Sequence, residues 1–211
     1  MRDIIAAMST TSPAPVAPER RIPWLPAVLL IVFGVVGWVA AFALTLDKFV
    51  TLENPDAVLN CDLSVIVQCG TNLRSAQGAV FGFPNPLLGL AGFVAPIAVG
   101  VGLLAGARFA RWFWALFMGG LTGALAFVIW LISQSIFVLG TLCPWCMVVW
   151  SVTIPLFLMT LLWCLAEGRF GSGRARALGR RLLPWTLPIT IACYLAVAVI
   201  GQLRLGFLQT L

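Results

Sequence analysis

The sequence predicts an all-α integral membrane protein built as a bundle of about five transmembrane helices. Of its 211 residues, 61% are hydrophobic and 9% are charged, whereas soluble domains carry roughly 25% charged residues. The mean hydropathy is +1.04, and five apolar segments each reach the roughly 20 residues that a helix needs to cross a bilayer. Because a chain this apolar cannot cover its surface as a water-soluble globule, we expect residues 24–211 to form one membrane domain.

The elements follow in order along the chain. Residues 1–23 are polar and rich in Ala, Ser and Pro, so we expect a flexible cytoplasmic tail that buries little apolar surface. This tail is not a secretory signal, because the apolar run after it is too long for a signal core. The expected spans are residues 24–46, 83–107, 112–133, 140–166 and 185–207, and a polar loop covers 47–82. The Ser133-Gln134-Ser135 triplet and Gly140 indicate a turn between the third and fourth spans.

The basic residues indicate the orientation of the spans. With a cytoplasmic N-terminus, ten of the 13 Lys and Arg residues lie inside, and Lys48, Arg74 and Arg204 lie outside, as the positive-inside rule requires. They flank the spans and form no patch, so nucleic acid is not an expected partner. This topology places the loop 47–82, the start of the fourth span and the C-terminus on the extracytoplasmic side of the cell membrane.

Cysteine is the residue type that can carry chemistry here, because the chain has six cysteines and no histidine. Cys61 and Cys69 lie in the loop, and Cys143-Pro144-Trp145-Cys146 opens the fourth span on the same side, which is an oxidising compartment. A cysteine at a helix N-terminus has a stabilised thiolate, and proline suits the first helical turn. Two such pairs on one face predict a relay of thiol–disulfide exchange.

Other interpretations of the cysteines stay open. Cys61 and Cys69 could form a structural disulfide; taken alone, this pair fits a structural and a redox-active role about equally. A zinc site is less expected, since histidine is absent and four-cysteine sites beside a membrane are uncommon. Cys164 lies roughly 27 Å along a helix from Cys146, and Cys193 falls inside the fifth span, so both are expected to act as small apolar side chains. We expect no metal, flavin or haem.

These motifs, taken in order, resemble the vitamin K epoxide reductase family. The resemblance covers residues 24–166 and implies a four-helix bundle around a quinone (menaquinone or ubiquinone), capped by the loop 47–82, with a fifth helix as in bacterial members. The motifs that carry it are Cys61-Asp62, Cys69, Ser75 six residues later, Asn85-Pro86-Leu87-Leu88-Gly89, and Cys143-Pro144-Trp145-Cys146.

The resemblance also implies roles for these residues. Cys61 would exchange with a thioredoxin-fold (DsbA-like) protein, Cys69 would pass electrons to Cys143, and Cys146 would face the quinone. Asn85 matches an asparagine that hydrogen-bonds a quinone carbonyl, although Asn85-Pro86 could merely cap the second span. Asp62 and Ser75 are expected to support the loop.

The aromatic residues are less specific. Phe81, Phe83, Trp145 and Trp150 could line a quinone pocket or form an interfacial belt; of these, we assign Phe83 and Trp150 to the quinone site. Trp150 departs from the tyrosine of vertebrate members, because an indole N–H donates a hydrogen bond but offers no hydroxyl oxygen to accept one.

The expected function is oxidation of an extracytoplasmic thioredoxin-fold protein with a membrane quinone as acceptor, which supports disulfide formation in exported proteins. Many bacterial members continue into a thioredoxin domain, and this sequence stops at Leu211, so a separate partner is expected. One alternative is reduction of vitamin K epoxide or quinone by the same relay. The unrelated four-helix thiol oxidase of bacteria has its CxxC before its spaced pair and is discounted. A structural or transport protein is a further alternative, but the spans hold no deep ionisable residue, which counts against transport.

Overall fold

The computed structural model describes residues 23–171 and 173–206, so the expected tail lies, apart from Pro23, outside the described residues. The described chain is helical, with one isolated bridge between two loop residues. Five stretches in it are long and apolar enough to cross a membrane, which confirms the predicted fold class. Their main helices are α2 (Trp24–Glu53), α4 (Pro86–Leu104), α5 (Arg111–Gln134), α6 (Pro144–Ala166) and α8 (Thr186–Leu205).

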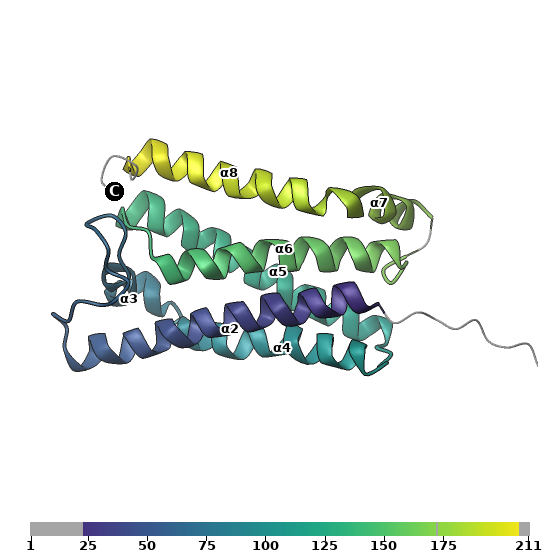
Figure 1. Cartoon of the computed structure of the whole chain (residues 1–211), viewed down its shortest axis with the longest axis horizontal. Helices are drawn as coiled ribbons and strands as arrows, with labels where there is room; N and C mark the ends of the chain where they lie inside the picture. The colour runs from purple at the N-terminus through teal and green to yellow at the C-terminus, as the bar shows by residue number, and fades with distance from the viewer. Residues whose placement is uncertain (1–22, 172, 207–211) are drawn as a thin grey trace, which may run out of the picture.

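The first four of these helices form a bundle. Helix α2 packs against α4 and α6, α5 packs against α6, and α8 lies along the outer side of α6 (Figure 1). Two short helices, α3 (Gly70–Arg74) and η1 (Ala76–Ala79), lie at one end, which we call the α3 end. At the opposite end, the α7 end, α7 (Arg174–Leu182) and η3 (Leu183–Trp185) connect α6 to α8.

The first helix is longer than predicted. The expected span stops at residue 46, whereas α2 continues through Asp47 and Lys48 to Glu53, because a charge ends a membrane span without ending a helix. The helix stops where Asn54, in extended conformation, precedes Pro55, since a residue before proline disfavours helical backbone.

The second and fourth spans begin later than predicted, and the turn between the third and fourth spans lies at Gly140 and not at the Ser133–Ser135 triplet. Helix α4 starts at Pro86, whose missing N–H is no loss in the first turn. The Ser133–Ser135 triplet stays helical, and a π-helical segment, η2 (Ser135–Leu139), extends α5. Gly140 ends it with φ of 69°, a left-handed conformation that favours glycine. Helix α6 therefore begins at Pro144 and not at residue 140.

Small residues bring α2 and α4 close together. A Cβ atom added to Gly34 would lie 2.6 Å from Ile97 Cγ1, and one added to Gly89 would lie 2.8 Å from the Cβ of Ala41. Such close backbone approach is how membrane helices gain packing contacts. Gly92 of α4, in contrast, has open space around it and borders a cavity.

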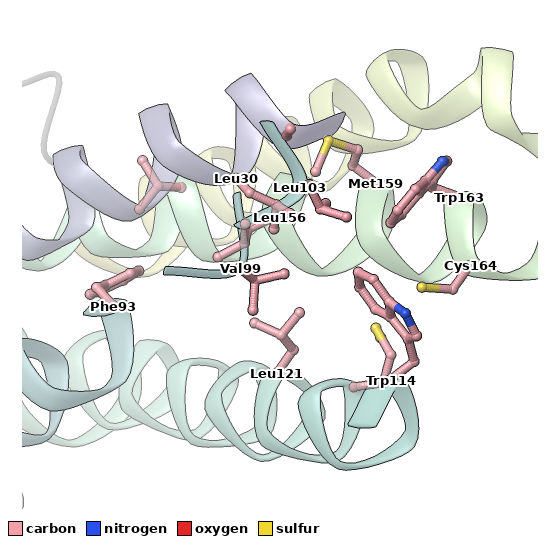
Figure 2. Close-up of a cluster of buried hydrophobic side chains, with 13 residues drawn as sticks. Leu30, Phe93, Val99, Leu103, Trp114, Leu121, Leu156, Met159, Trp163 and Cys164 are labelled. Carbon is pink, nitrogen blue, oxygen red and sulfur yellow. The ribbon is translucent and has the colours of Figure 1, made fainter. Parts of the chain in front are cut away.

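The buried core is strongest toward the α7 end. Trp114 of α5 is fully buried and packs edge-on against Trp163 of α6, with ring centroids 5.2 Å apart. The guanidinium carbon of Arg169 lies 4.4 Å and 4.6 Å from these two ring centroids. Cys164 is also fully buried and lies beside Trp114 (Figure 2). This cluster ties α5 to α6 far from the loop cysteines.

Candidate active site

The loop at the α3 end carries a disulfide between Cys61 and Cys69. The chain between them folds back on itself, since the N–H groups of Leu63 and Ser64 both donate to the carbonyl of Val67, at 2.9 Å and 3.0 Å. Both cysteines are buried, with Cys61 6% and Cys69 0% exposed. A thiol from another protein therefore reaches this disulfide only if the loop gives way.

The carboxylate of Asp62 holds this loop in shape. Its Oδ1 accepts hydrogen bonds from the N–H groups of Cys69 at 2.8 Å and Gly70 at 3.0 Å, and its Oδ2 accepts one from Leu59 at 3.0 Å. Burial raises the pKa of Asp62, but these three hydrogen bonds and the charge of Arg74 outweigh it and leave the pKa below the ordinary 3.8. Asp62 is thus ionised at neutral pH, where it joins both ends of the disulfide loop.

Backbone pairing attaches the loop to the segment that leads into α6. The N–H of Gln68 donates to the carbonyl of Leu142 at 3.0 Å, and the N–H of Leu142 donates to the carbonyl of Ile66 at 2.8 Å. These bonds form a parallel bridge between Val67 and Leu142. Cys143 directly follows Leu142, and Cys69 lies two residues after Val67, so the bridge brings the two cysteines side by side.

A second attachment comes from side chains that the sequence reasoning missed. Asn72 of α3 donates from Nδ2 to Thr141 Oγ1 at 2.9 Å and accepts from Ser135 Oγ at 3.0 Å. Thr141 and Ser135 are both buried. No motif in the sequence joins these positions, which lie more than 60 residues apart.

The second cysteine pair opens α6. Cys143 is the N-cap residue in extended conformation, its Sγ accepts a hydrogen bond from the N–H of Cys146 at 3.4 Å, and Pro144 is the first helical residue. Cys143 and Cys146 are free thiols. Cys143 Sγ lies 3.3 Å from Cys69 Sγ, within the 3–3.5 Å at which reacting atoms form a near-attack arrangement. A thiol and a disulfide therefore meet at a distance that permits exchange.

A cavity of about 1050 Å³ begins beside Cys146 and runs along the bundle between α4 and α5. Its walls are mostly apolar, and they reach Trp112 near the α7 end. Thr153 lines it within α6, and the other polar side chains gather at the α3 end and are Asn72, Ser75, Gln77, Asn85, Gln134 and Ser135. Such a space suits a ring with polar edges joined to a long apolar chain.

The residues predicted to bind a quinone all border this cavity, namely Asn85, Phe83 and Trp150. Asn85 stands at the N-cap of α4, but its side chain makes no capping bond. Its Nδ2 instead donates to the carbonyl of Gln77 at 2.7 Å, and its Oδ1 accepts from the N–H of Val80 at 3.1 Å. An amide group has two N–H donors, so the second one can serve a carbonyl in the cavity.

The remaining predicted residues lie around these groups. Ser75 donates to the carbonyl of Asn72 at 2.7 Å and accepts from the N–H of Gly78 at 3.2 Å, so it shapes the turn below the cavity. Trp145 packs against the cysteine cluster and does not border the cavity. Cys164 and Cys193 are free thiols and take part in none of these contacts.

Asp47, at the end of α2, joins the two loop cysteines in a group whose potential metal-ligand atoms lie within 4.8 Å of one another. Cysteine binds metals as a thiolate, and here the two sulfurs are bonded to each other. In this oxidised state the group offers a metal ion only the carboxylate of Asp47.

Comparison with known proteins gives one family. The family model described as "Vitamin K epoxide reductase family" matches residues 28–161 of the chain. The matched region contains both cysteine pairs, Asn85 and the four bundle helices up to residue 161 of α6. No curated protein matches the chain.

Proposed function

The chain belongs to the vitamin K epoxide reductase family, and from this premise we propose that it oxidises an extracytoplasmic thioredoxin-fold (DsbA-like) protein and passes the electrons to a membrane quinone. The family and the membrane-spanning helices make it a membrane disulfide oxidoreductase in general terms. The proposal adds the partner, the quinone (menaquinone or ubiquinone), and a role in disulfide formation for exported proteins. The observation that carries it is the 3.3 Å separation between the Cys143 thiol and the Cys69 sulfur of the loop disulfide.

The proposed relay begins at the loop. A thiolate of the partner attacks Cys61, the Cys61–Cys69 bond breaks, and Cys69 leaves as a thiolate. Cys69 then attacks Cys143 of an oxidised Cys143–Cys146 pair, which frees Cys146. The partner's second thiol attacks the partner sulfur that is bonded to Cys61, which forms the partner's disulfide and releases Cys61. Attack of Cys61 on Cys69 then releases Cys143, and this leaves the loop oxidised and the CxxC pair reduced. The pairing in the structure, one loop disulfide and two free thiols, is the product of that sequence.

The residues at the cavity fit a quinone as the acceptor. A bound quinone supplies a sink for two electrons, so that the pair Cys143 and Cys146 can return to a disulfide. Cys146 lies on the cavity wall at the end where Asn85 offers its amide, and a donor aimed at a carbonyl stabilises the charge that develops there. The apolar walls provide room for an isoprenoid chain and exclude water.

The exposed surface near Cys61 supports a protein partner. Val58 and Leu63, on either side of Cys61 in sequence, are 84% and 68% exposed, although both are apolar and would gain from being covered. Since Cys61 itself is buried, docking on this segment would have to displace the residues that cover the sulfur. This would restrict exchange to a partner that binds, as opposed to any small thiol.

The test is quinone reduction by the purified protein in detergent, driven by a reduced thioredoxin-fold protein. Wild type should turn over, Cys61→Ala and Cys146→Ala should lose at least about a hundredfold in rate, and the matched control Cys193→Ala should behave as wild type. If quinone is not reduced by wild type, or if Cys146→Ala is as active as Cys193→Ala, the proposed function is wrong.

A further inference from the structure

Asp47 is the one acidic side chain that touches a reacting sulfur in the described part of the chain. Its Oδ2 lies 3.4 Å from Cys61 Sγ, at a partly buried position at the end of α2. The neighbouring Lys48 does not neutralise it, because Lys48 Nζ donates to the carbonyl of Leu73 at 2.6 Å. Within residues 23–171 and 173–206, no other hydrogen bond or ion pair holds the carboxyl group of Asp47.

Asp47 and Cys143 contact different sulfurs of the same disulfide. Cys143 Sγ approaches Cys69 at 3.3 Å, and Asp47 Oδ2 approaches Cys61 at 3.4 Å. A disulfide-bonded sulfur carries no proton, so this contact is attractive when the carboxyl group is protonated and donates its O–H to the sulfur. When Cys61 is a thiol, the same two atoms lie where S–H can donate to a carboxylate.

We propose that Asp47 is the acid–base residue for Cys61 in the relay, an inference that rests on the proposed function. In the resolving step Cys61 is a thiol and Cys69 is bonded to Cys143. The Cys61 sulfur attacks Cys69, its proton passes to the Asp47 carboxylate, the Cys61–Cys69 bond forms, and the Cys69–Cys143 bond breaks with its electron pair on Cys143. Cys61 is oxidised from a thiol to a disulfide sulfur, Cys143 is reduced from a disulfide sulfur to a thiolate, and Cys69 stays in a disulfide, so atoms, protons and electrons balance.

The need for such a residue follows from the chemistry of thiols. The ordinary pKa of a cysteine is about 8.5, so only a few per cent of thiols are ionised at neutral pH, and only the thiolate attacks a disulfide. Cys143 stands at the N-terminus of α6, whereas Cys61 lies in a loop with no helix start of its own. A carboxylate in contact with the thiol removes its proton as the new bond forms.

The charges around Asp47 are few. Besides Asp47, the charged groups around this site are Lys48 of α2, Asp62 of the loop and Arg74 of α3. Asp62 interacts with both Asp47 and Arg74. Helices α4 and α6, which pack against α2, contain no Asp, Glu, Lys or Arg. A change in the pH dependence of exchange on substitution of Asp47 can therefore be assigned to this carboxyl, with Asp62 as the one neighbouring acid.

The test isolates the resolving step and needs neither quinone nor partner. In Cys146→Ser protein, the Cys69–Cys143 and Cys61–Cys69 disulfides interconvert by intramolecular exchange. The protein is oxidised with one equivalent of diamide at pH 5 and jumped to pH values between 6 and 9.5. The two disulfides are then followed by acid quench, alkylation and peptide mass mapping. The compared variants carry Asp47→Asn, Asp47→Glu or, as an exposed control, Asp56→Asn.

We expect Asp47→Asn to slow the interconversion at least about tenfold at pH 7. This deficit should vanish by about pH 9.5, which is above the ordinary pKa of a thiol, and Asp47→Glu should restore most of the rate. Asp56→Asn should leave the rate unchanged. The proposal is overturned if Asp47→Asn matches Asp56→Asn at every pH, or if it slows exchange by the same factor at every pH, as a structural role would. Failure of the quinone assay with normal interconversion would overturn the proposed function and leave this role of Asp47 standing.

Discussion

Replacement of Asp62 by asparagine should make the loop disulfide easier to reduce. The carboxylate accepts three backbone hydrogen bonds, from Cys69, Gly70 and Leu59, at 2.8–3.0 Å. Asparagine has only one acceptor oxygen, so it can accept hydrogen bonds either from the N–H groups of Cys69 and Gly70 or from that of Leu59. Its NH₂ group then points at the remaining N–H donor and cannot accept from it. At least one charge-assisted bond is lost, each of which is worth about 1.5–3 kcal/mol.

The expected magnitude is smaller than this, because Asp62 is partly exposed and solvent screens its charge. We take about 1–2 kcal/mol. If this energy stabilises only the closed, oxidised loop, the reduction potential of Cys61–Cys69 rises by about 20–45 mV, since 30 mV corresponds to about 1.4 kcal/mol for two electrons.

The assay is titration of the protein in glutathione redox buffers at pH 7, followed by alkylation with a maleimide that shifts the mobility of the reduced form. All proteins in this assay also carry Cys143→Ser and Cys146→Ser. Of the two functional cysteine pairs, only the loop pair can then form a disulfide and respond to the redox buffer. Asp56→Asn serves as the control, since Asp56 is exposed and its carboxylate accepts no backbone hydrogen bond in the described residues. A shift for Asp62→Asn no larger than that for Asp56→Asn would refute the reasoning.

Three further predictions concern pH, the cavity and the core. Because the pKa of Asp62 is lowered in the folded protein, its carboxylate should contribute fully to folding stability above its ordinary pKa and lose this contribution as the pH falls through the lowered value. Below about pH 4, the thermal midpoint of wild type should therefore fall, and that of Asp62→Asn should fall less. Gly120 borders the cavity and its neighbour Gly119 does not, so Gly120→Phe should raise the KM for quinone about tenfold by displacing apolar contacts while Gly119→Phe leaves it unchanged; equal KM values would place the quinone elsewhere. Arg169→Leu should lower the thermal midpoint, because it removes two cation–π contacts that are each worth about 0.5–2 kcal/mol. The same substitution at the exposed Arg174 is the control, and equal midpoints for the two variants would contradict the prediction.

The helix boundaries show how much of the fold can be predicted from the sequence. Apolar length predicts every spanning helix, but α2 runs seven residues past the predicted end, and the start of α6 lies four residues later than predicted. Hydropathy detects where lipid contact ends, whereas a helix ends where the backbone cannot continue, as at Asn54 before Pro55 and at Gly140. The orientation predicted from the arginines stays a prediction.

The candidate site divides in the same way. The motifs predict that Cys61, Cys69, Cys143 and Cys146 are the redox-active residues. The predicted membrane topology places the two pairs at one end of the bundle. The order of contact between them does not follow from spacing. Asp47 illustrates the limit, because a charged residue after an apolar run marks only the end of a span, and nothing local indicates that its carboxyl group reaches Cys61.

The sequence by itself determined that this is a five-span membrane protein with two cysteine pairs on one side. That information is local, because each segment's preference for lipid and each arginine's preference for water act independently of the other segments. Only the tertiary structure decided that Cys69 meets Cys143 at 3.3 Å, that Asp47 meets Cys61, and that a cavity of about 1050 Å³ opens beside Cys146. These features depend on side-chain packing between segments far apart in the sequence, such as Cys69 and Cys143, which are 74 residues apart. Packing at that range is a property of the whole bundle.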